Sequence, residues 1–212
     1  MKVLVGECTG TMADRIQALG WGRMWIARGR NIYAYLGEPW GLDNGAFRDW
    51  REGVPFNGDA FLRSVDKALN EYEPPYLAVC PDIVGGGLES LDFSLGWLDR
   101  LPDHFPWYLA VQDGLAPADV EPHIHQFAGL FLGGTLAFKA TAPTWRELAT
   151  EHDKRFHYGR CGTLGRVRQA IHHGADSLDS AFPMWTRSRW NLFVDAINGF
   201  GQSDLFLKGD AA

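Results

Sequence analysis

Two aspartates, Asp43 and Asp179, are the residues in this chain whose type and setting best suit catalysis. Asp179 closes a short predicted strand that a proline-broken loop follows, and Asp43 closes a similar strand far upstream. One carboxylate can form a covalent bond with a substrate while a second moves a proton. We therefore predict that the two side chains reach one opening and act as a pair.

Further polar residues close the other predicted strands. Asp82 ends one apolar run, Gln112 ends the next, and Gly133 and Gly134 end a third. Acids that converge on one mouth repel one another and add nothing to stability, so the set indicates a functional site rather than a series of turn residues. The glycine pair allows the backbone to approach a flat ligand, because a Cβ there would hold the ligand away.

The elements that would position these residues alternate between strand and helix. Each predicted strand is a short, nearly continuous apolar run, as expected for strands with both faces buried. The predicted strands are Lys2–Gly6, Trp40–Asp43, Tyr76–Asp82, Trp107–Gln112, Leu130–Gly134, Phe156–Gly159 and Ser177–Ser180. The predicted helices are Met12–Leu19, Asp59–Tyr72, Leu88–Leu101, Ala118–Phe127, Thr144–Glu151, Leu164–His173 and Ser188–Gly199.

This alternation predicts a compact TIM-type (β/α)8 barrel of the α/β class, with Leu205–Leu207 as the eighth strand. Catalytic residues of such barrels lie at the carboxyl ends of the strands, where the polar residues above are found. An open doubly wound sheet is the alternative, although no GxGxxG motif follows the first strand. Residues 20–39 fit neither element, and we expect an inserted hairpin around Asn31–Leu36.

The composition is that of one globular domain over residues 1–212, with 46% hydrophobic and 22% charged residues. The chain has neither a run of about 18 apolar residues nor a basic and then apolar N-terminus. We therefore expect no membrane span, no signal peptide and a cytoplasmic location. The three cysteines are far apart and the histidines, His157 among them, are scattered, so we predict structural roles for them, no bound metal and no cofactor.

The net charge of −6 argues against broad, nonspecific binding to nucleic acid. The charge is uneven, however, because basic residues are concentrated within 154–189. One interpretation is a solvated basic face. The other is a track for a phosphate backbone, with Arg160, Arg187, Arg189 and, further upstream, Lys139 as the contacts.

Five motifs resemble, in the same order, motifs of the tRNA-guanine transglycosylases. They are Asp43–Phe47, Cys80–Asp82, Val111–Gly114, Leu132–Ala137 and Gly174–Pro183, and they span residues 40–190 with the Thr-Arg pair at 186–187. The family's zinc site has no counterpart after the last motif, because no cysteine follows Cys161. The chain therefore resembles most the short, zinc-free DNA-guanine transglycosylases of phages, which implies a barrel without the zinc-binding subdomain.

The resemblance implies a base-exchange reaction in DNA. Asp179 would attack the anomeric carbon of the sugar, displace guanine and form a covalent glycosyl-enzyme intermediate. Asp43 would be the general acid and base for the leaving and incoming bases. The partners would be DNA and a 7-deazaguanine such as 7-cyano-7-deazaguanine, in the host cytoplasm if the chain is encoded by a phage.

The same resemblance assigns the residues that would bind the base. Asp82 and Gln112 would form hydrogen bonds with the guanine edge. The amide of Gly134, next to Gly133, would donate to the purine carbonyl. Phe47 would stack on the ring, a role for which Phe182 is the alternative.

Other functions are compatible with the same residues. The polymer is tRNA rather than DNA in one alternative. In a second, the barrel is a glycoside or phosphoester hydrolase that uses Asp43 and Asp179 as its acid pair. In a third, it binds nucleic acid without catalysis, although such a protein has no reason to keep two mutually repelling acids.

Overall fold

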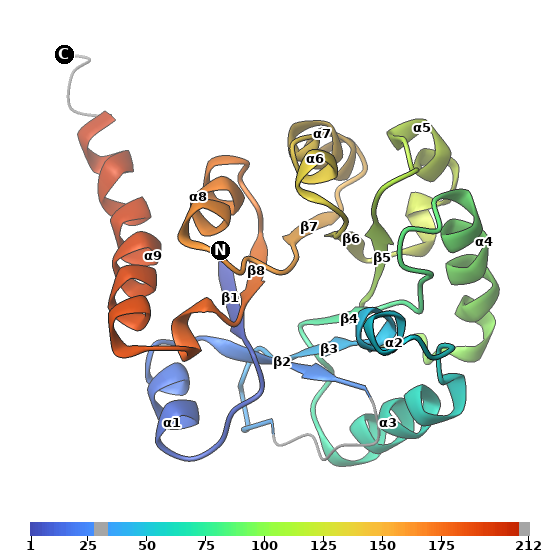
Figure 1. Ribbon diagram of the computed structural model, residues 1–212, viewed down its shortest axis with the longest axis horizontal. Coiled ribbons are helices and arrows are strands. Elements are labelled where there is room, and N and C mark those ends of the chain that lie inside the picture. The colour runs from blue at the N-terminus through green and yellow to red at the C-terminus, as the bar shows by residue number, and fades with distance from the viewer. Residues whose placement is uncertain (28–33, 208–212) are drawn as a thin grey trace.

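A closed barrel of eight parallel strands forms the centre of the protein in the computed structural model (Figure 1). The structure describes residues 1–27 and 34–207, those from 200 onward as backbone only. Each strand pairs with the next along the chain, and the last pairs with the first. The strands are β1 (Lys2–Val5), β2 (Gly22–Ile26), β3 (Gly41–Asp43), β4 (Leu77–Val79), β5 (Trp107–Val111), β6 (Gly129–Leu132), β7 (Arg155–Tyr158) and β8 (Ser177–Ser180).

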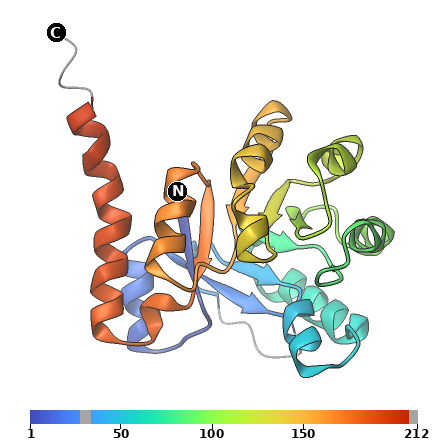
Figure 2. The ribbon, with the colours of Figure 1, turned by 45° about the horizontal axis from the view of Figure 1, so that its top comes forward.

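Helices surround this barrel and α9 lies beside α8 (Figure 2). The α-helices are α1 (Thr11–Ala18), α2 (Ala46–Glu52), α3 (Gly58–Glu71), α4 (Leu88–Trp97), α5 (Pro117–Val120), α6 (Leu136–Lys139), α7 (Ala142–Glu151), α8 (Leu164–His172) and α9 (Arg187–Leu207). Short 3-10 turns cover Leu98–Arg100, Glu121–Gln126 and Phe182–Met184. Among the described residues, no helix combines the length and apolar character that crossing a membrane requires. The closed parallel barrel and the helices around it confirm the predicted barrel of the α/β class.

The strand that completes the eight, and that the sequence did not predict, is β2. The prediction of a strand at Leu205–Leu207 is wrong, because those residues end helix α9. β2 is hard to recognise from the sequence because the strand contains Arg23, whose charge suggests a surface position. Arg23 is nevertheless only 1% exposed, since its guanidinium pairs with Glu38, with Nε 2.7 Å from Oε1. Residues 31–33 of the hairpin predicted around Asn31–Leu36 lie outside the described part of the chain, and residues 34–36 form no strand.

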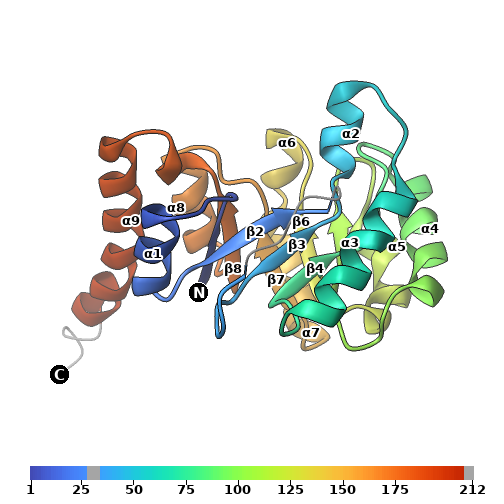
Figure 3. The ribbon, with the colours of Figure 1, turned by 90° about the horizontal axis from the view of Figure 1, so that it is seen from below.

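Two apolar layers hold the barrel together. Side chains that point inward, such as Leu4, Met24 and Phe131, form a small cluster inside the barrel. Those that point outward pack with the helices in a much larger cluster. Since all strands are parallel, their carboxyl ends open on one side, and Figure 3 shows α2 beyond the tips of β2 and β3 on that side.

Candidate active site

The two predicted catalytic aspartates lie at the same end of the barrel. Asp43 is the last residue of β3, and Asp179 is the third residue of β8. Only β1 and β2 separate these strands around the barrel, with Asp179 in register with Leu4 and Asp43 in register with Ile26. The parallel barrel thus brings together two residues that are far apart in the sequence.

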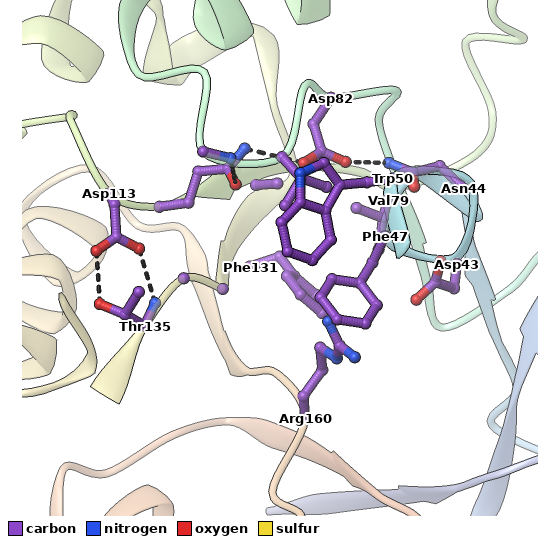
Figure 4. A pocket seen from close by; sticks show the side chains of 16 residues that line it. Asp43, Asn44, Phe47, Trp50, Val79, Asp82, Asp113, Phe131, Thr135 and Arg160 are labelled. Atoms are coloured by element: carbon purple, nitrogen blue, oxygen red, sulfur yellow. Dashed lines mark hydrogen bonds between the residues drawn. The ribbon is translucent and has the colours of Figure 1, made fainter. Parts of the chain in front are cut away.

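One cavity at this end, which we call the Asp82 cavity, combines aromatic and acidic walls (Figure 4). Its volume is ≈ 350 Å³, near the lower end of the range for small-molecule sites, about 300 to 1,000 Å³. Phe47, Trp50 and Phe131 supply aromatic surface, and Asp43 and Asp82 supply carboxylates. Such a lining suits a flat, aromatic molecule that carries hydrogen-bond donors.

Asp82 is held rigidly in this cavity by amide groups. The side-chain nitrogen of Asn44 donates to its Oδ1 over 2.7 Å, and that of Gln112 donates to its Oδ2 over 2.9 Å. Gln112 is itself fixed, because its oxygen accepts from the backbone of Gly85 at 2.9 Å. Burial raises the pKa of Asp82, while the two amide donors oppose that rise. Gln112 therefore lines the cavity, as predicted, but the polar atoms of its side chain form hydrogen bonds with Asp82 and with the neighbouring loop.

A second cavity, the Asp179 cavity, lies next to the first and has a volume of ≈ 300 Å³. Asp43, Phe47 and Arg160 line both cavities, whereas Asp179 lines only the second and Asp82 only the first. The guanidinium carbon of Arg160 lies 3.2 Å from the centre of the Phe47 ring. The junction of the two cavities is therefore formed by a carboxylate and a stacked cation and ring.

The pKa values of the two aspartates are shifted in opposite directions. Burial raises the pKa of Asp43 to about 6, the Gly45 amide opposes the rise, and the charges of Asp179 and Asp82 add to it. Burial also disfavours charge on Asp179, but hydrogen bonds from His157 and from the Arg160 amide hold its pKa below the ordinary value. One acid is thus suited to carry a proton near neutral pH, and the other to stay ionised.

His157 contributes to the site, although the sequence predicted only a structural role for it. It lies in β7 with its side chain inside the barrel, stacked on Phe131 with ring centres 4.8 Å apart. Its Nε2 lies 3.0 Å from Oδ1 of Asp179. The signal was the period of two in β7, because His157 alternates with the outward-packing Phe156 and Tyr158.

The predicted glycine pair lies at the rim of the Asp82 cavity. Gly134 has a φ of 76°, and a Cβ there would lie 2.5 Å from a carboxylate oxygen of Asp113. That carboxylate accepts from both the backbone nitrogen of Thr135, at 2.7 Å, and its hydroxyl, at 2.5 Å. Only glycine suits this position, and the turn brings the backbone of Gly133 and Gly134 to the cavity wall.

The prediction that Lys139 contacts a phosphate backbone is wrong. Its side chain is buried, with 4% of the residue exposed, and its ammonium group donates to the carbonyl oxygens of Leu132, at 3.0 Å, and Gly159. It also lies 4.6 Å from the centre of the Tyr158 ring. Burial lowers the pKa of Lys139 to about 8. The lysine therefore links the end of β6 to the residue that follows β7.

The remaining predicted phosphate contacts are at or near the surface. Arg160 lies at the junction of the cavities. Arg187 is exposed at the start of α9, where it lines a groove against α1. Arg189 lies 4.6 Å from the ring centre of Trp185 and 5.5 Å from that of Phe182. Phe182 is buried beneath this arginine and does not line the Asp82 cavity, so Phe47 is the better placed ring for stacking.

Sequence reasoning missed Trp50, which lines the Asp82 cavity although 58% of it is exposed. Its ring centre lies 5.4 Å from that of Phe47, one turn earlier on α2. An exposed tryptophan one helical turn from a predicted stacking ring is the signal that could have identified it. The described residues contain no group of three or more His, Cys, Asp or Glu side chains arranged for a metal ion.

Comparison with known protein families finds no family model that matches this chain. Comparison with curated proteins finds no matching relative.

Proposed function

We propose that this protein is a base-exchange transglycosylase that replaces guanine in DNA with a 7-deazaguanine, through a covalent bond between Asp179 and the sugar. The motif order described above, which resembles that of the guanine transglycosylases, supports this function. The arrangement of the two cavities supports it independently of any resemblance.

The observation that carries the proposal is that Asp43 lines both cavities, between Asp82 in one and Asp179 in the other. A nucleoside consists of a flat base and a sugar joined by a single C1′–N9 bond. With the base in the Asp82 cavity and the sugar in the Asp179 cavity, this bond lies at the junction, next to Asp43. A nucleophile on the sugar side and a proton donor at the bond are what its cleavage requires.

The reaction then has two matched halves. A lone pair of Asp179 forms a bond to C1′ as the C1′–N9 bond breaks, the electron pair of that bond leaves with guanine, and Asp43 gives guanine a proton. The incoming base gives its N9 proton to Asp43, attacks C1′ through N9 and displaces the Asp179 carboxylate. Atoms and charge balance, and both aspartates return to their starting states.

The Asp82 cavity supplies the groups that a guanine ring needs. The Asp82 carboxylate, oriented by Asn44 and Gln112, accepts hydrogen bonds from the ring N–H and the exocyclic amine. Phe47, with the Arg160 guanidinium on its face, offers a surface for stacking. To enter this cavity, the target base must leave the stack, at a cost of a few kcal/mol.

DNA is favoured over tRNA by the wall of the Asp179 cavity. Met24, Ile26 and Ala181 form an apolar part of this wall, which offers no hydrogen-bond partner to a 2′-hydroxyl, while Glu7, Arg48 and Arg51 are among the charged residues that line the rest of the cavity. Ser180, a polar residue of the same lining, already donates to the Cys161 carbonyl at 2.5 Å and accepts from the Phe182 amide at 3.1 Å. A deoxyribose has no 2′-hydroxyl that would lose its hydrogen bonds to water against this apolar part.

The proposal is tested by incubating the purified protein with guanine-containing DNA, or with tRNA, and labelled guanine or 7-cyano-7-deazaguanine. We expect label in the DNA, identified by nucleoside mass spectrometry, and a protein–DNA adduct that survives denaturation. Asp179→Asn should abolish both. Asp92→Asn, a change at an exposed carboxylate on the outer helix α4, is the matched control and should leave both intact.

Three outcomes would contradict the proposal in different ways. Incorporation that survives Asp179→Asn would reject the nucleophile. Label in tRNA alone would reject DNA as the polymer. Release of free guanine with no incorporation of any base supplied would favour a hydrolase that uses the same acid pair.

A further inference from the structure

The surroundings of Asp179 treat its two carboxylate oxygens differently. Oδ1 lies 3.0 Å from Nε2 of His157 and 2.7 Å from the backbone nitrogen of Arg160. Oδ2 accepts no hydrogen bond from any residue that the structure describes, and the side chain, 17% exposed, lines the Asp179 cavity. We propose that His157 and the Arg160 amide clamp Oδ1, and that this clamp reserves Oδ2 as the attacking atom. The inference rests on the proposed function.

The protons in the barrel interior fit this arrangement. A carboxylate can only accept hydrogen bonds, so Nε2 of His157 carries the proton that faces Asp179. Nδ1 of His157 lies 2.8 Å from Oγ of Ser177. The Ser177 hydroxyl can therefore donate to Nδ1 and fix the tautomer of His157.

The imidazole cannot easily turn away from Asp179, because its other surfaces are packed. His157 is fully buried, and its ring is stacked on Phe131 with an interplanar angle of 18°. Phe131 in turn lines the Asp82 cavity. The same ring therefore supports a wall of one cavity and the carboxylate of the other.

The second arm of the clamp is a single peptide group, that between Gly159 and Arg160. Its N–H donates to Oδ1 of Asp179, and its carbonyl oxygen accepts from the ammonium group of Lys139. Two hydrogen bonds on opposite ends of one peptide polarise it and strengthen each other. Arg160 reaches this geometry with a φ of 58°, a backbone conformation that side chains other than glycine rarely adopt. His157 thus holds Oδ1 directly, and Lys139 fixes the peptide group whose N–H holds the same oxygen.

The clamp would matter because the attack has a demanding geometry. The lone pair of Oδ2 must point at C1′ while the C1′–N9 bond breaks on the opposite side, and a carboxylate free to rotate meets that condition only part of the time. A misplacement of about 1 Å can cost on the order of a hundredfold in rate. His157 acts through Asp179 and does not touch the sugar, so it is a positioning residue.

The test compares His157→Leu, which removes the donor, with His157→Gln, whose amide nitrogen can still donate to Oδ1. The rate of adduct formation with DNA is measured in a single turnover, together with the Kd for DNA. We expect His157→Leu to slow adduct formation by about 10- to 100-fold with an unchanged Kd, and His157→Gln to recover most of the loss. His172→Leu, on α8, is the matched control and should have no effect.

A spectroscopic measurement keeps the inference separate from the proposed function. The imidazole ¹⁵N resonances of His157 should show the proton on Nε2 and should shift in Asp179→Ala. Unchanged resonances in that variant, or a full rate of adduct formation in a folded His157→Leu protein, would overturn the clamp. If the unsubstituted protein forms no adduct while the resonances respond to Asp179→Ala, the proposed function fails and the contact at Oδ1 stands.

Discussion

Asp43 and Asp179 have the same side chain, but the barrel gives them different neighbours. Asp43 has one backbone donor, from Gly45 at 2.7 Å, and faces the negative charges of Asp179 and Asp82. Asp179 has two donors to one oxygen and the favourable charge of Lys139. The difference suits Asp43 to be the acid and Asp179 the nucleophile of the proposed reaction. It also predicts opposite effects of the two residues on stability.

We expect Asp43→Asn to stabilise the protein near pH 8 and to have little effect near pH 4. Folding raises the pKa of Asp43 from 3.8 to about 6, so the wild-type protein loses stability as pH rises through that interval. Asparagine removes the charge and keeps an oxygen for the Gly45 amide. The gain above pH 6 should be on the order of 1–3 kcal/mol, measured by urea unfolding across the pH range.

Asp179→Asn is the control for this measurement, with the opposite sign. The pKa of Asp179 is lowered in the folded protein, so its charge stabilises the fold above the unfolded pKa and the benefit is lost on acidification. Asp179→Asn should therefore destabilise at neutral pH. If both variants change the free energy of unfolding in the same direction at neutral pH, the assigned environments are wrong.

The pKa of Asp43 also predicts how the first half of the proposed reaction depends on pH. Departure of guanine needs the protonated acid, and above about pH 6 each further pH unit reduces its fraction tenfold. The single-turnover rate of adduct formation should fall accordingly. Asp43→Asn should lower this rate by ~10²–10⁴ and remove the inflection. An inflection that persists in Asp43→Asn would assign the proton to another group.

At the residue scale, the sequence predicted the polar residues at or just beyond the ends of strands and missed those that support them. Asp43, Asp82, Gln112 and Asp179 each close a recognisable apolar run, so their position follows from the fold. His157 lies within a strand, where its contact with Asp179 depends on the register of β7 against β8. Register is a property of the folded sheet, and it is not encoded in either strand alone.

At the element scale, the alternation of strand and helix was predictable because buried parallel strands are almost uniformly apolar. β2 was not predicted because its arginine suggested a surface position, whereas in the structure that arginine is paired with Glu38, a partner 15 positions away. The prediction that Lys139 is a surface contact was wrong for the same reason. The carbonyl groups that bind its ammonium group come from the end of β6 and from the residue that follows β7. Buried charges are recognised only when their partners are known.

The place of β2 in the barrel makes a prediction about Gly22. A Cβ at this position would lie 2.2 Å from the carbonyl oxygen of Pro39, which cannot move without shifting the segment that leads into β3. Gly22→Ala should therefore destabilise the protein by about 3 kcal/mol or more. Thermal or urea unfolding measures the change.

Gly96→Ala is the matched control, because Gly96 lies inside helix α4 and, apart from its chain neighbours and the backbone of its own helix, no atom lies within 4 Å of its added Cβ. This change should stabilise the protein by about 0.5–1 kcal/mol, since alanine loses less backbone entropy in a helix. Equal effects of the two substitutions would mean that Pro39 does not pack against β2.

At the scale of the whole molecule, the distribution of charge matters more than its sum. The net charge of −6 would repel a polyanion. Arginines are nevertheless placed in segments that follow strand ends, and therefore at the mouth of the barrel: Arg48 and Arg51 on α2, Arg160 after β7, and Arg187 and Arg189 at the start of α9. This basic rim can bind phosphates locally while the rest of the surface repels them.

The rim predicts how binding depends on salt. In the Asp179→Asn background, which binds without reacting, Arg51→Ala and Arg187→Ala should each weaken binding to DNA and reduce the slope of log K against log salt by about 1. Fluorescence anisotropy with a labelled oligonucleotide over a range of salt concentrations measures both. Lys67→Ala, in the second half of α3 and away from the mouth, removes the same charge and should leave the slope unchanged. If all three substitutions change the slope equally, the attraction comes from net charge, and the mouth has no special role in holding the backbone.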